Sequence, residues 1–397
     1  MFILHWVLLV SASAALLNGQ VSERARKLHQ DALVFDAHVH IGNRQFYTGT
    51  DLSQRYPDGH VDLPRLKEGG LDVMLFSLSV GERYYPARHE TKQTLRLLDS
   101  ALIQIERNSD KIEVALNASD VDRIVKQRKI AAILDLEGCF DLDGDLGVLR
   151  SLYRLGLRAA MLPAHNWANE FADSCCAPPK WGGINEQGRK VVREMNRLGM
   201  VINISHASDQ TVEQTVEVSS HPVIASHHGL RSFNDIPRNM PDHVLKKLAS
   251  KGGVIAFHIG HSFHSKAFYD WETRRRGKVF FDTSEIGQKE ARMSIAELDR
   301  VSAKALPSVG PQPPDELWMS VDDYLKVVER AIALVGEDHV ALGSDFDGRV
   351  APPREIRDVR DYPALTEGML RRGWSEQRIR KFLGENLMRV FRQVTEK

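Results

Sequence analysis

Eight short apolar segments recur along the chain, and six of them end in His, Asp or Glu. The segments are Leu33–His40, Leu71–Leu78, Ala131–Glu137, Ala159–His165, Val201–His206, Pro222–His227, Gly253–Phe257 and Val340–Asp345. Their nearly continuous apolar character is typical of parallel strands that are covered on both faces. A series of this kind restricts the chain to a parallel α/β fold.

Amphipathic stretches separate the apolar segments and complete repeating strand–helix units. The clearest are Glu90–Asn108, Asn185–Leu198, Ser208–Ser219, Pro241–Ser250 and Val321–Leu334. Eight such units predict a (β/α)₈ TIM barrel with its active site at the carboxyl ends of the strands. The composition is that of an ordinary globular protein, with 42% hydrophobic and 27% charged residues. We therefore expect a single domain over residues 20–397.

Two stretches lie outside the repeat. A long connection follows the seventh strand, at about residues 258–320, and is predicted to be a lid or a substrate wall; a solvated insertion or a dimer contact is the alternative. Within it, His258, His261 and His264 are interpreted as polar residues of the lid, although on a helical turn they could bind metal or line the pocket. Residues 375–397 are predicted to form one or two helices packed on the outside of the barrel.

The first 19 residues have the pattern of a secretory signal peptide. The apolar run Phe2–Val10 is followed by the small residues Ser11–Ala15, which is typical of a signal and its cleavage site. The run is shorter than the roughly 20 residues that span a bilayer. We therefore expect export with cleavage, and the alternatives are a retained membrane anchor and a buried first helix.

Composition also excludes several classes of protein. The 53 basic and 53 acidic residues balance, whereas a nucleic-acid-binding protein normally has a basic excess. The sequence has neither a glycine-rich phosphate loop nor Gly-x-Ser-x-Gly, which argues against a nucleotide enzyme and a serine hydrolase. Three cysteines cannot build a disulfide framework. The adjacent Cys175 and Cys176 are predicted to be free thiols, with a vicinal disulfide or a bond to Cys139 as alternatives.

Histidines and acidic residues at the predicted strand ends indicate a metal centre. His38 and His40 alternate in the first strand, so they lie on one face and can share a cation such as Zn²⁺. Glu137, His206 and His227 end three other strands, and burying such groups together is costly unless a cation compensates. The five side chains suffice for two divalent cations that share the carboxylate, with room for a water between them.

Asp345, at the end of the eighth strand, is a candidate general base. With a metal pair beside it, this carboxylate could take a proton from the water and pass it to a leaving amine. The alternative is a structural aspartate at a strand end.

The order and type of these residues resemble the renal (membrane) dipeptidase family of the amidohydrolase superfamily. The segments that carry the resemblance are Asp36–His40, Leu136–Gly138, Ile204–His206, Ala225–His227, Arg238–Asp242, Gly343–Gly348 and Gly384–Phe391. They occur in the family's order over nearly the whole chain after the leader. The resemblance implies a zinc dipeptidase with an amidohydrolase-type barrel, and it suggests a homodimer.

The resemblance also implies a role for each site residue. Glu137 would bridge two zinc ions, with His38 and His40 completing one site and His206 and His227 the other. His165 would contact the scissile carbonyl. Arg238 would bind the carboxylate of the substrate. Asp345 would contact both the bridging water and the substrate amine.

One residue departs from the family pattern. The family usually has His-x-Asp in the first strand, whereas this chain has His40 in the acidic position. Imidazole still binds zinc, but the exchange removes a negative charge, so we expect a more electrophilic metal pair and a shifted substrate preference. The leading prediction is an exported dipeptidase with two divalent metal ions and a small peptide substrate. The alternatives are a tailoring enzyme acting on a larger peptide or an N-acyl amino acid, and a metal-binding pseudoenzyme.

Overall fold

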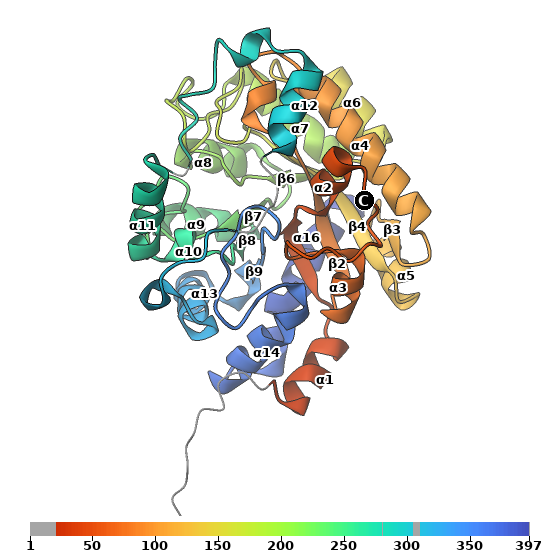
Figure 1. Ribbon diagram of the computed structural model, residues 1–397, viewed down its shortest axis with the longest axis vertical. Coiled ribbons are helices and arrows are strands. Elements are labelled where there is room, and N and C mark those ends of the chain that lie inside the picture. The colour runs from red at the N-terminus through yellow and green to blue at the C-terminus, as the bar shows by residue number, and fades with distance from the viewer. Residues whose placement is uncertain (1–20, 280, 305–309, 397) are drawn as a thin grey trace, which may run out of the picture.

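The computed structural model describes residues 21–279, 281–304 and 310–396, so the predicted signal peptide lies outside the described residues. Eight parallel strands surround one axis in the order β1-β2-β4-β5-β6-β7-β8-β9, with helices outside them (Figure 1). The strands are β1 (Phe35–Val39), β2 (Val73–Ser79), β4 (Ile130–Glu137), β5 (Ala159–Met161), β6 (Val201–Asn203), β7 (Ile224–His228), β8 (Val254–Phe257) and β9 (Val340–Leu342).

The barrel is closed between β1 and the segment that follows β9. Val39 and Phe346 form a parallel bridge, and the His40 amide donates to the Phe346 carbonyl at 3.0 Å. The Asp345 amide donates to the His38 carbonyl at 2.9 Å. These contacts complete the predicted TIM barrel and place the ends of β1 and β9 side by side.

The predicted helices are present with small shifts at their ends. The helices around the barrel are α1 (Glu23–Asp31), α2 (Ile41–Thr48), α3 (Leu63–Glu68), α4 (Glu90–Arg107), α5 (Ala118–Lys126), α6 (Leu146–Arg154), α7 (Glu186–Leu198), α8 (Asp209–Val218), α9 (Asp242–Ser250), α13 (Val321–Val335), α14 (Tyr362–Arg371), α15 (Glu376–Arg380) and α16 (Asn386–Thr395). Across the described ranges, none of the helices combines the length and the apolar character that a membrane span requires.

Three predicted strand ends are turns rather than strand. The residues His165, His206 and Asp345 have φ values of 57°, 64° and 59°. This left-handed backbone is incompatible with a continuing strand, so β5, β6 and β9 end before these residues. An additional short strand, β3 (Ile112–Val114), pairs with the start of β4 and was not predicted.

The connection after β8 is folded into helices and reaches across to the opposite side of the barrel. It contains α10 (His261–His264), α11 (Lys266–Arg276) and α12 (Ile295–Ala303). Asp299 of α12 accepts hydrogen bonds from the Tyr84 hydroxyl at 2.7 Å and from Arg96 at 2.6 Å. Both partners follow β2, so the insertion extends over the mouth of the barrel, near α2 and α4 in Figure 1.

Helix α16 closes the opposite end of the barrel. Its Leu387, Val390 and Phe391 pack against inward-facing residues such as Phe35 and Ile133 in one buried cluster.

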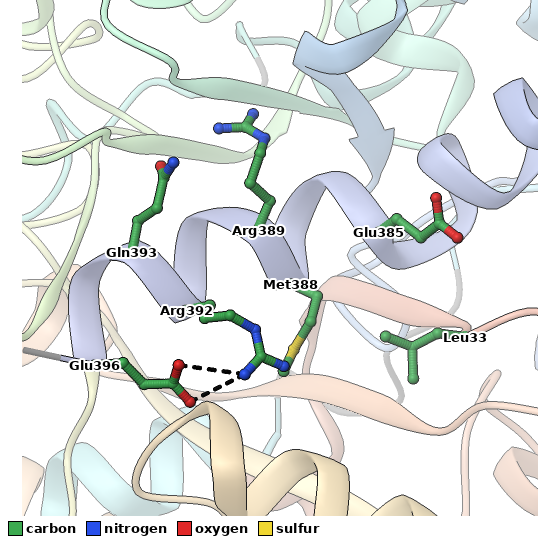
Figure 2. A pocket seen from close by; sticks show the side chains of 7 residues that line it. All are labelled: Leu33, Glu385, Met388, Arg389, Arg392, Gln393 and Glu396. Atoms are coloured by element: carbon green, nitrogen blue, oxygen red, sulfur yellow. Dashed lines mark hydrogen bonds and ion pairs between the residues drawn. The ribbon is translucent and has the colours of Figure 1, made fainter.

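A cavity of about 600 Å³ lies beside α16, lined by Leu33, Glu385, Met388, Arg389, Arg392, Gln393 and Glu396 (Figure 2). Arg392 pairs with Glu396 at 3.0 Å in this lining. Leu33 precedes β1, so the cavity lies at the amino ends of the strands, whereas the predicted site lies at their carboxyl ends.

The adjacent cysteines Cys175 and Cys176 form a disulfide, so the prediction of two free thiols was wrong. Their loop is held in a tight turn, because the Cys175 amide donates to the His206 carbonyl at 2.8 Å and Ser174 forms a bridge with Ala207. Cys139 is a buried free thiol.

A buried histidine in α1 predicts a pH dependence of folding. Burial lowers the pKa of His29 from 6.5 to about 4, although a hydrogen bond to the Gly69 carbonyl opposes the shift. Between these pH values the unfolded chain binds a proton that the folded chain does not. The stabilisation by neutral His29 is therefore complete above pH 6.5 and is lost as the pH falls toward 4, by roughly 3 kcal/mol.

Chemical denaturation of the wild type and of His29→Gln at several pH values measures this effect. The free energy of unfolding of the variant should fall less steeply than that of the wild type between pH 6.5 and 4. His243→Gln is the matched control, because the His243 side chain is 69% exposed. Equal slopes for all three proteins would contradict the assignment to His29.

Candidate metal centre

The carboxylate of Glu137, the last residue of β4, lies among four imidazoles at the carboxyl end of the barrel. Its Oε1 lies 3.4 Å from His38 Nε2, 3.3 Å from His206 Nε2 and 3.4 Å from His227 Nε2. Its Oε2 lies 3.3 Å from His40 Nε2. The structure therefore brings together the five side chains that the sequence predicts as metal ligands.

The Nε2 atoms of these imidazoles lie so close together that they cannot all be paired by hydrogen bonds. The Nε2 atoms of His38 and His40 are 3.2 Å apart, and those of His206 and His227 are 3.1 Å apart. Two ring lone pairs at this distance repel each other unless a proton or a cation lies between them. Glu137 Oε2 is buried and has no hydrogen-bond partner among the described residues. The donor set therefore fits divalent cations.

The second ring nitrogen of three of these histidines is held by a polar side chain. The contacts are Ser77 Oγ to His38 Nδ1 at 2.8 Å, Ser226 Oγ to His227 Nδ1 at 2.9 Å and Asn166 Oδ1 to His206 Nδ1 at 2.9 Å. Because an amide oxygen only accepts, His206 Nδ1 carries the hydrogen and its Nε2 presents a lone pair to the centre. Partners of this kind fix the ring orientation of metal-binding histidines.

The charges at the centre also suit a cation. Burial alone would raise the pKa of Glu137, but the imidazoles of His40 and His38 hold it well below its usual range. Burial lowers the pKa of His206 and His227 well below 6.5. Burial also lowers the pKa of His38, but Glu137 and other nearby carboxylates outweigh it and raise the pKa to about 10. Because a metal ion binds an ionised carboxylate and neutral imidazoles, binding at this centre would displace the proton of His38.

Asp345 reaches the same centre from the turn after β9. Its Oδ1 lies 2.8 Å from His40 Nε2, and its Oδ2 contacts His258 Nε2 at 2.9 Å. Burial raises the pKa of Asp345, but the hydrogen bond from His258 and the proximity of His40 outweigh it and keep the carboxyl ionised. Together with His38 and His40 it forms a further group that could hold a metal. Its position suits a proton acceptor beside the metal centre, and it also suits a ligand.

His165 lies next to Glu137 and is oriented by a second carboxylate. Its Nε2 is 3.5 Å from Glu137 Oε1, and its Nδ1 makes a short hydrogen bond with Glu82. Burial lowers the pKa of His165, but Glu82 and then Glu137 raise it to about 10. The Asn166 amide donates to the same Glu82 oxygen at 2.9 Å and bonds His206. One carboxylate thus orients His165 directly and His206 through Asn166.

Arg238 is a fully buried cation with free donors. It lies in the loop between β7 and α9, and its Nη2 donates to the His227 carbonyl at 3.0 Å. Its Nε and Nη1 have no partner among the described residues. Burial lowers the pKa of Arg238 to about 9, with Glu137 and Asp345 opposing the shift, so the group remains charged at neutral pH. Such an arginine suits the carboxylate of a ligand.

Sequence reasoning missed part of this site. It assigned His258 to a lid loop, which was wrong, because the side chain is buried and contacts Asp345. The residue directly follows β8, so the search for polar residues at strand ends, which selected the predicted ligands, could have found it. Glu82 begins a short 3₁₀ helix (Glu82–Tyr84) after β2, and no sequence pattern distinguishes it or Asn166.

Comparison with known proteins identifies the family of the chain. A model of the membrane dipeptidase family, peptidase family M19, matches residues 22–397. The chain is 33% identical to dipeptidase tcpJ of Claviceps purpurea (strain 20.1) over 349 residues, which is 85% of this chain and 70% of that protein. It is 28% identical to dipeptidase 3 of Mus musculus over 387 residues, which is 95% of this chain and 67% of that protein.

Solved structures show the same fold. The probable dipeptidase PvdM of Pseudomonas aeruginosa has a TM-score of 0.77 at 20% identity, over 94% of this chain and 98% of that chain. A metallo peptidase of Rhodobacter sphaeroides, solved with a phosphinate mimic of the dipeptide L-Ala-D-Ala, has a TM-score of 0.73 at 22% identity. This structural match covers 92% of this chain and 100% of the Rhodobacter sphaeroides chain.

Proposed function

The chain belongs to the membrane dipeptidase family, peptidase family M19, and on this premise we propose that it is an exported dipeptidase that uses two zinc ions. As a member of this family, the chain is a metallopeptidase that hydrolyses peptide bonds, and its substrate is a small peptide. The proposal of two metal ions is supported above all by one observation: Glu137 lies within 3.4 Å of Nε2 atoms from four histidines.

The donors divide into two sets that share Glu137. His38 and His40 would hold one cation, and His206 and His227 the other. Two divalent cations held in this way would supply Lewis-acid chemistry, lowering the pKa of a water and polarising the carbonyl of the scissile amide. Histidine and carboxylate ligands suit zinc, although other divalent ions accept them.

The chain's own residues would carry out the remaining steps. His165, held protonated by Glu82, would donate from Nε2 to the carbonyl oxygen as negative charge develops there. Asp345 would accept a proton at Oδ1 and pass it to the leaving amine. Arg238 would hold the substrate carboxylate with its free Nε and Nη1 donors and so fix the position of the amide.

Metal analysis and a substrate panel test the proposal. The purified chain is expected to contain about two divalent ions, to lose activity with a chelator and to regain it with Zn²⁺. The panel contains dipeptides with L- or D-residues in the second position, tripeptides and N-acyl amino acids. A metal-free protein, or one that hydrolyses none of these dipeptides, would contradict the proposal.

An N-acyl amino acid or a larger peptide is the second candidate substrate. The specific feature that favours it is His40, which replaces the family's usual aspartate beside Glu137 and Asp345. The exchange removes a negative charge that would attract the ammonium group of a dipeptide. Faster hydrolysis of N-acyl amino acids or tripeptides than of dipeptides would favour this candidate.

The Arg238→Ala variant tests how the substrate is held. It should raise KM for substrates with a free carboxylate about 100-fold, because a charged hydrogen-bonded pair worth about 2–3 kcal/mol is lost. The KM for the corresponding amides should change little, since they lack the charge. Arg231→Ala is the control, because Arg231 is already paired with Asp209 at 2.7 Å. Equal effects of Arg238→Ala on acids and amides would exclude the clamp.

Export and dimerisation remain proposals. The apolar run at residues 2–10 supports secretion, and sequencing the amino terminus of the mature protein after expression with its leader checks this. Light scattering of the purified chain distinguishes a homodimer from a monomer.

A further inference from the structure

Asp345 forms a hydrogen bond with His258, a histidine that has no role in the function proposed above. We propose that His258 is a positioning residue, which holds the Asp345 carboxylate so that Oδ1, rather than Oδ2, faces the substrate. The proposal rests on the proposed function in one respect, namely that Asp345 acts in the reaction. The contact itself is independent of the substrate.

The hydrogen bonds of His258 determine which ring nitrogen carries the hydrogen. The Gly260 amide lies 2.7 Å from His258 Nδ1, and a backbone N–H can only donate. Nδ1 is therefore the acceptor, and the hydrogen of the neutral ring is on Nε2. This hydrogen points to Asp345 Oδ2, which lies 2.9 Å away.

The imidazole of His258 has little freedom to turn away. Its ring stacks on Phe263, with centroids 3.8 Å apart and an angle of 12° between the planes. A Cβ at position 260 would lie 2.5 Å from His258 Cε1, so the glycine permits the close approach of backbone and ring. His258 is also almost fully buried. The ring is therefore clamped between a backbone amide, an aromatic ring and the carboxylate.

The consequence is that the two oxygens of Asp345 have different surroundings. Oδ2 is occupied by His258, whereas Oδ1 is buried without a hydrogen-bond partner among the described residues and lies 2.8 Å from His40 Nε2. The free oxygen is thus the one beside the metal centre. The Arg238 guanidinium carbon lies 5.3 Å from the centroid of Phe263, so the same aromatic ring contacts the proposed carboxylate clamp and the support of the base.

Four variants separate positioning from a structural role. His258→Phe keeps a ring against Phe263 but removes the donor, and His258→Gln restores an N–H at nearly the position of Nε2. His261→Phe is the matched control. His261 follows β8 as His258 does, and its replacement removes hydrogen bonds to Ala351 and Met319 but none to Asp345. All proteins are first reconstituted with excess zinc. Metal content and melting temperature are then measured for each, and kcat and KM are measured on the same dipeptide.

The expected result is a fall in kcat for His258→Phe of roughly 10- to 100-fold, the size typical of a lost hydrogen bond to a charged group. KM and metal content should stay within about threefold of the wild type. His258→Gln should recover most of the loss, and Gly260→Ala, which displaces the ring, should resemble His258→Phe. Any of three results would overturn the proposal. The kcat of His258→Phe could be no lower than that of His261→Phe, or His258→Gln could fail to recover kcat. The third is a loss of metal in His258→Phe that matches its loss of kcat.

A spectroscopic measurement tests the contact without any substrate. In the zinc-loaded full chain with ¹⁵N-labelled histidine, the His258 signals, identified by their absence in His258→Phe, should show a bare Nδ1 and a protonated Nε2. A protonated Nδ1 would overturn the proposal even if the dipeptidase activity is found. A wild type that cleaves no dipeptide would contradict the proposed function, while this measurement would still decide the contact.

Discussion

Replacing Glu137 with glutamine is expected to remove metal from both proposed sites and to lower kcat/KM by roughly 10⁴-fold, because Lewis-acid stabilisation is worth several kcal/mol and each ~1.4 kcal/mol changes a rate tenfold. The carboxylate is 2% exposed and places one oxygen or the other near each of four imidazoles. Glutamine has the same shape but replaces one oxygen with an NH₂ group. That group would point hydrogens at the cation instead of a lone pair.

Elemental analysis of metal per chain, together with steady-state kinetics on the best dipeptide, measures both effects. The melting temperature of the wild type should fall on adding a chelator, because a ligand that binds only the folded state stabilises it. The melting temperature of Glu137→Gln should be insensitive to the chelator. Glu90→Gln is the control, since Glu90 is also buried but belongs to α4. Full metal content in Glu137→Gln would refute the shared ligand.

The barrel and the convergence of these ligands could be predicted from the sequence for a simple reason. The carboxyl ends of parallel strands meet at one mouth, so residues remote in sequence that end such strands become neighbours. Glu137 and His227 lie at the ends of β4 and β7 as this reasoning requires. His206 and Asp345 come close to the centre from turns beyond β6 and β9, with left-handed backbone that no apolar pattern reveals.

The parts of the site that were missed depend on loop conformation. Glu82 reaches His165 from the connection after β2, a pairing between residues 83 positions apart. The disulfide of Cys175 and Cys176 likewise depends on a turn set by backbone contacts to His206 and Ala207. Periodicity and composition carry no information on such contacts, because they depend on the path of individual loops rather than on a repeating face.

The charge at position 40 links the structure to the choice of substrate. His40 Nε2 lies 3.3 Å from Glu137 and 2.8 Å from Asp345. An aspartate in its place would put a third carboxylate beside these two, which would neutralise more of the cation charge and attract an ammonium group. With histidine, the proposed cations would keep more of their charge, so we expect the polarisation of the carbonyl to matter more than recognition of a substrate amine.

Replacing Asp345 with asparagine is expected to lower kcat by at least roughly 10³-fold while leaving metal content nearly intact, since proton transfer by a positioned base contributes about 10²–10⁴-fold. Asparagine keeps an oxygen that can accept from His258 Nε2, so the local structure has little reason to change. It cannot take a proton at the position of Oδ1, and therefore the transfer from the water to the leaving amine fails. KM should change little.

Metal analysis decides between the two positions that the geometry allows for this residue. Oδ1 of Asp345 forms a group with His38 and His40 that could hold a cation, so a ligand role predicts loss of about one ion per chain in Asp345→Asn. Asp347→Asn is the control from the same segment, because the Asp347 carboxylate accepts from the His60 amide and pairs with Arg44 instead. If activity and one metal ion are lost together in Asp345→Asn but not in Asp347→Asn, Asp345 is a ligand of the first site. If activity alone is lost, it is the base.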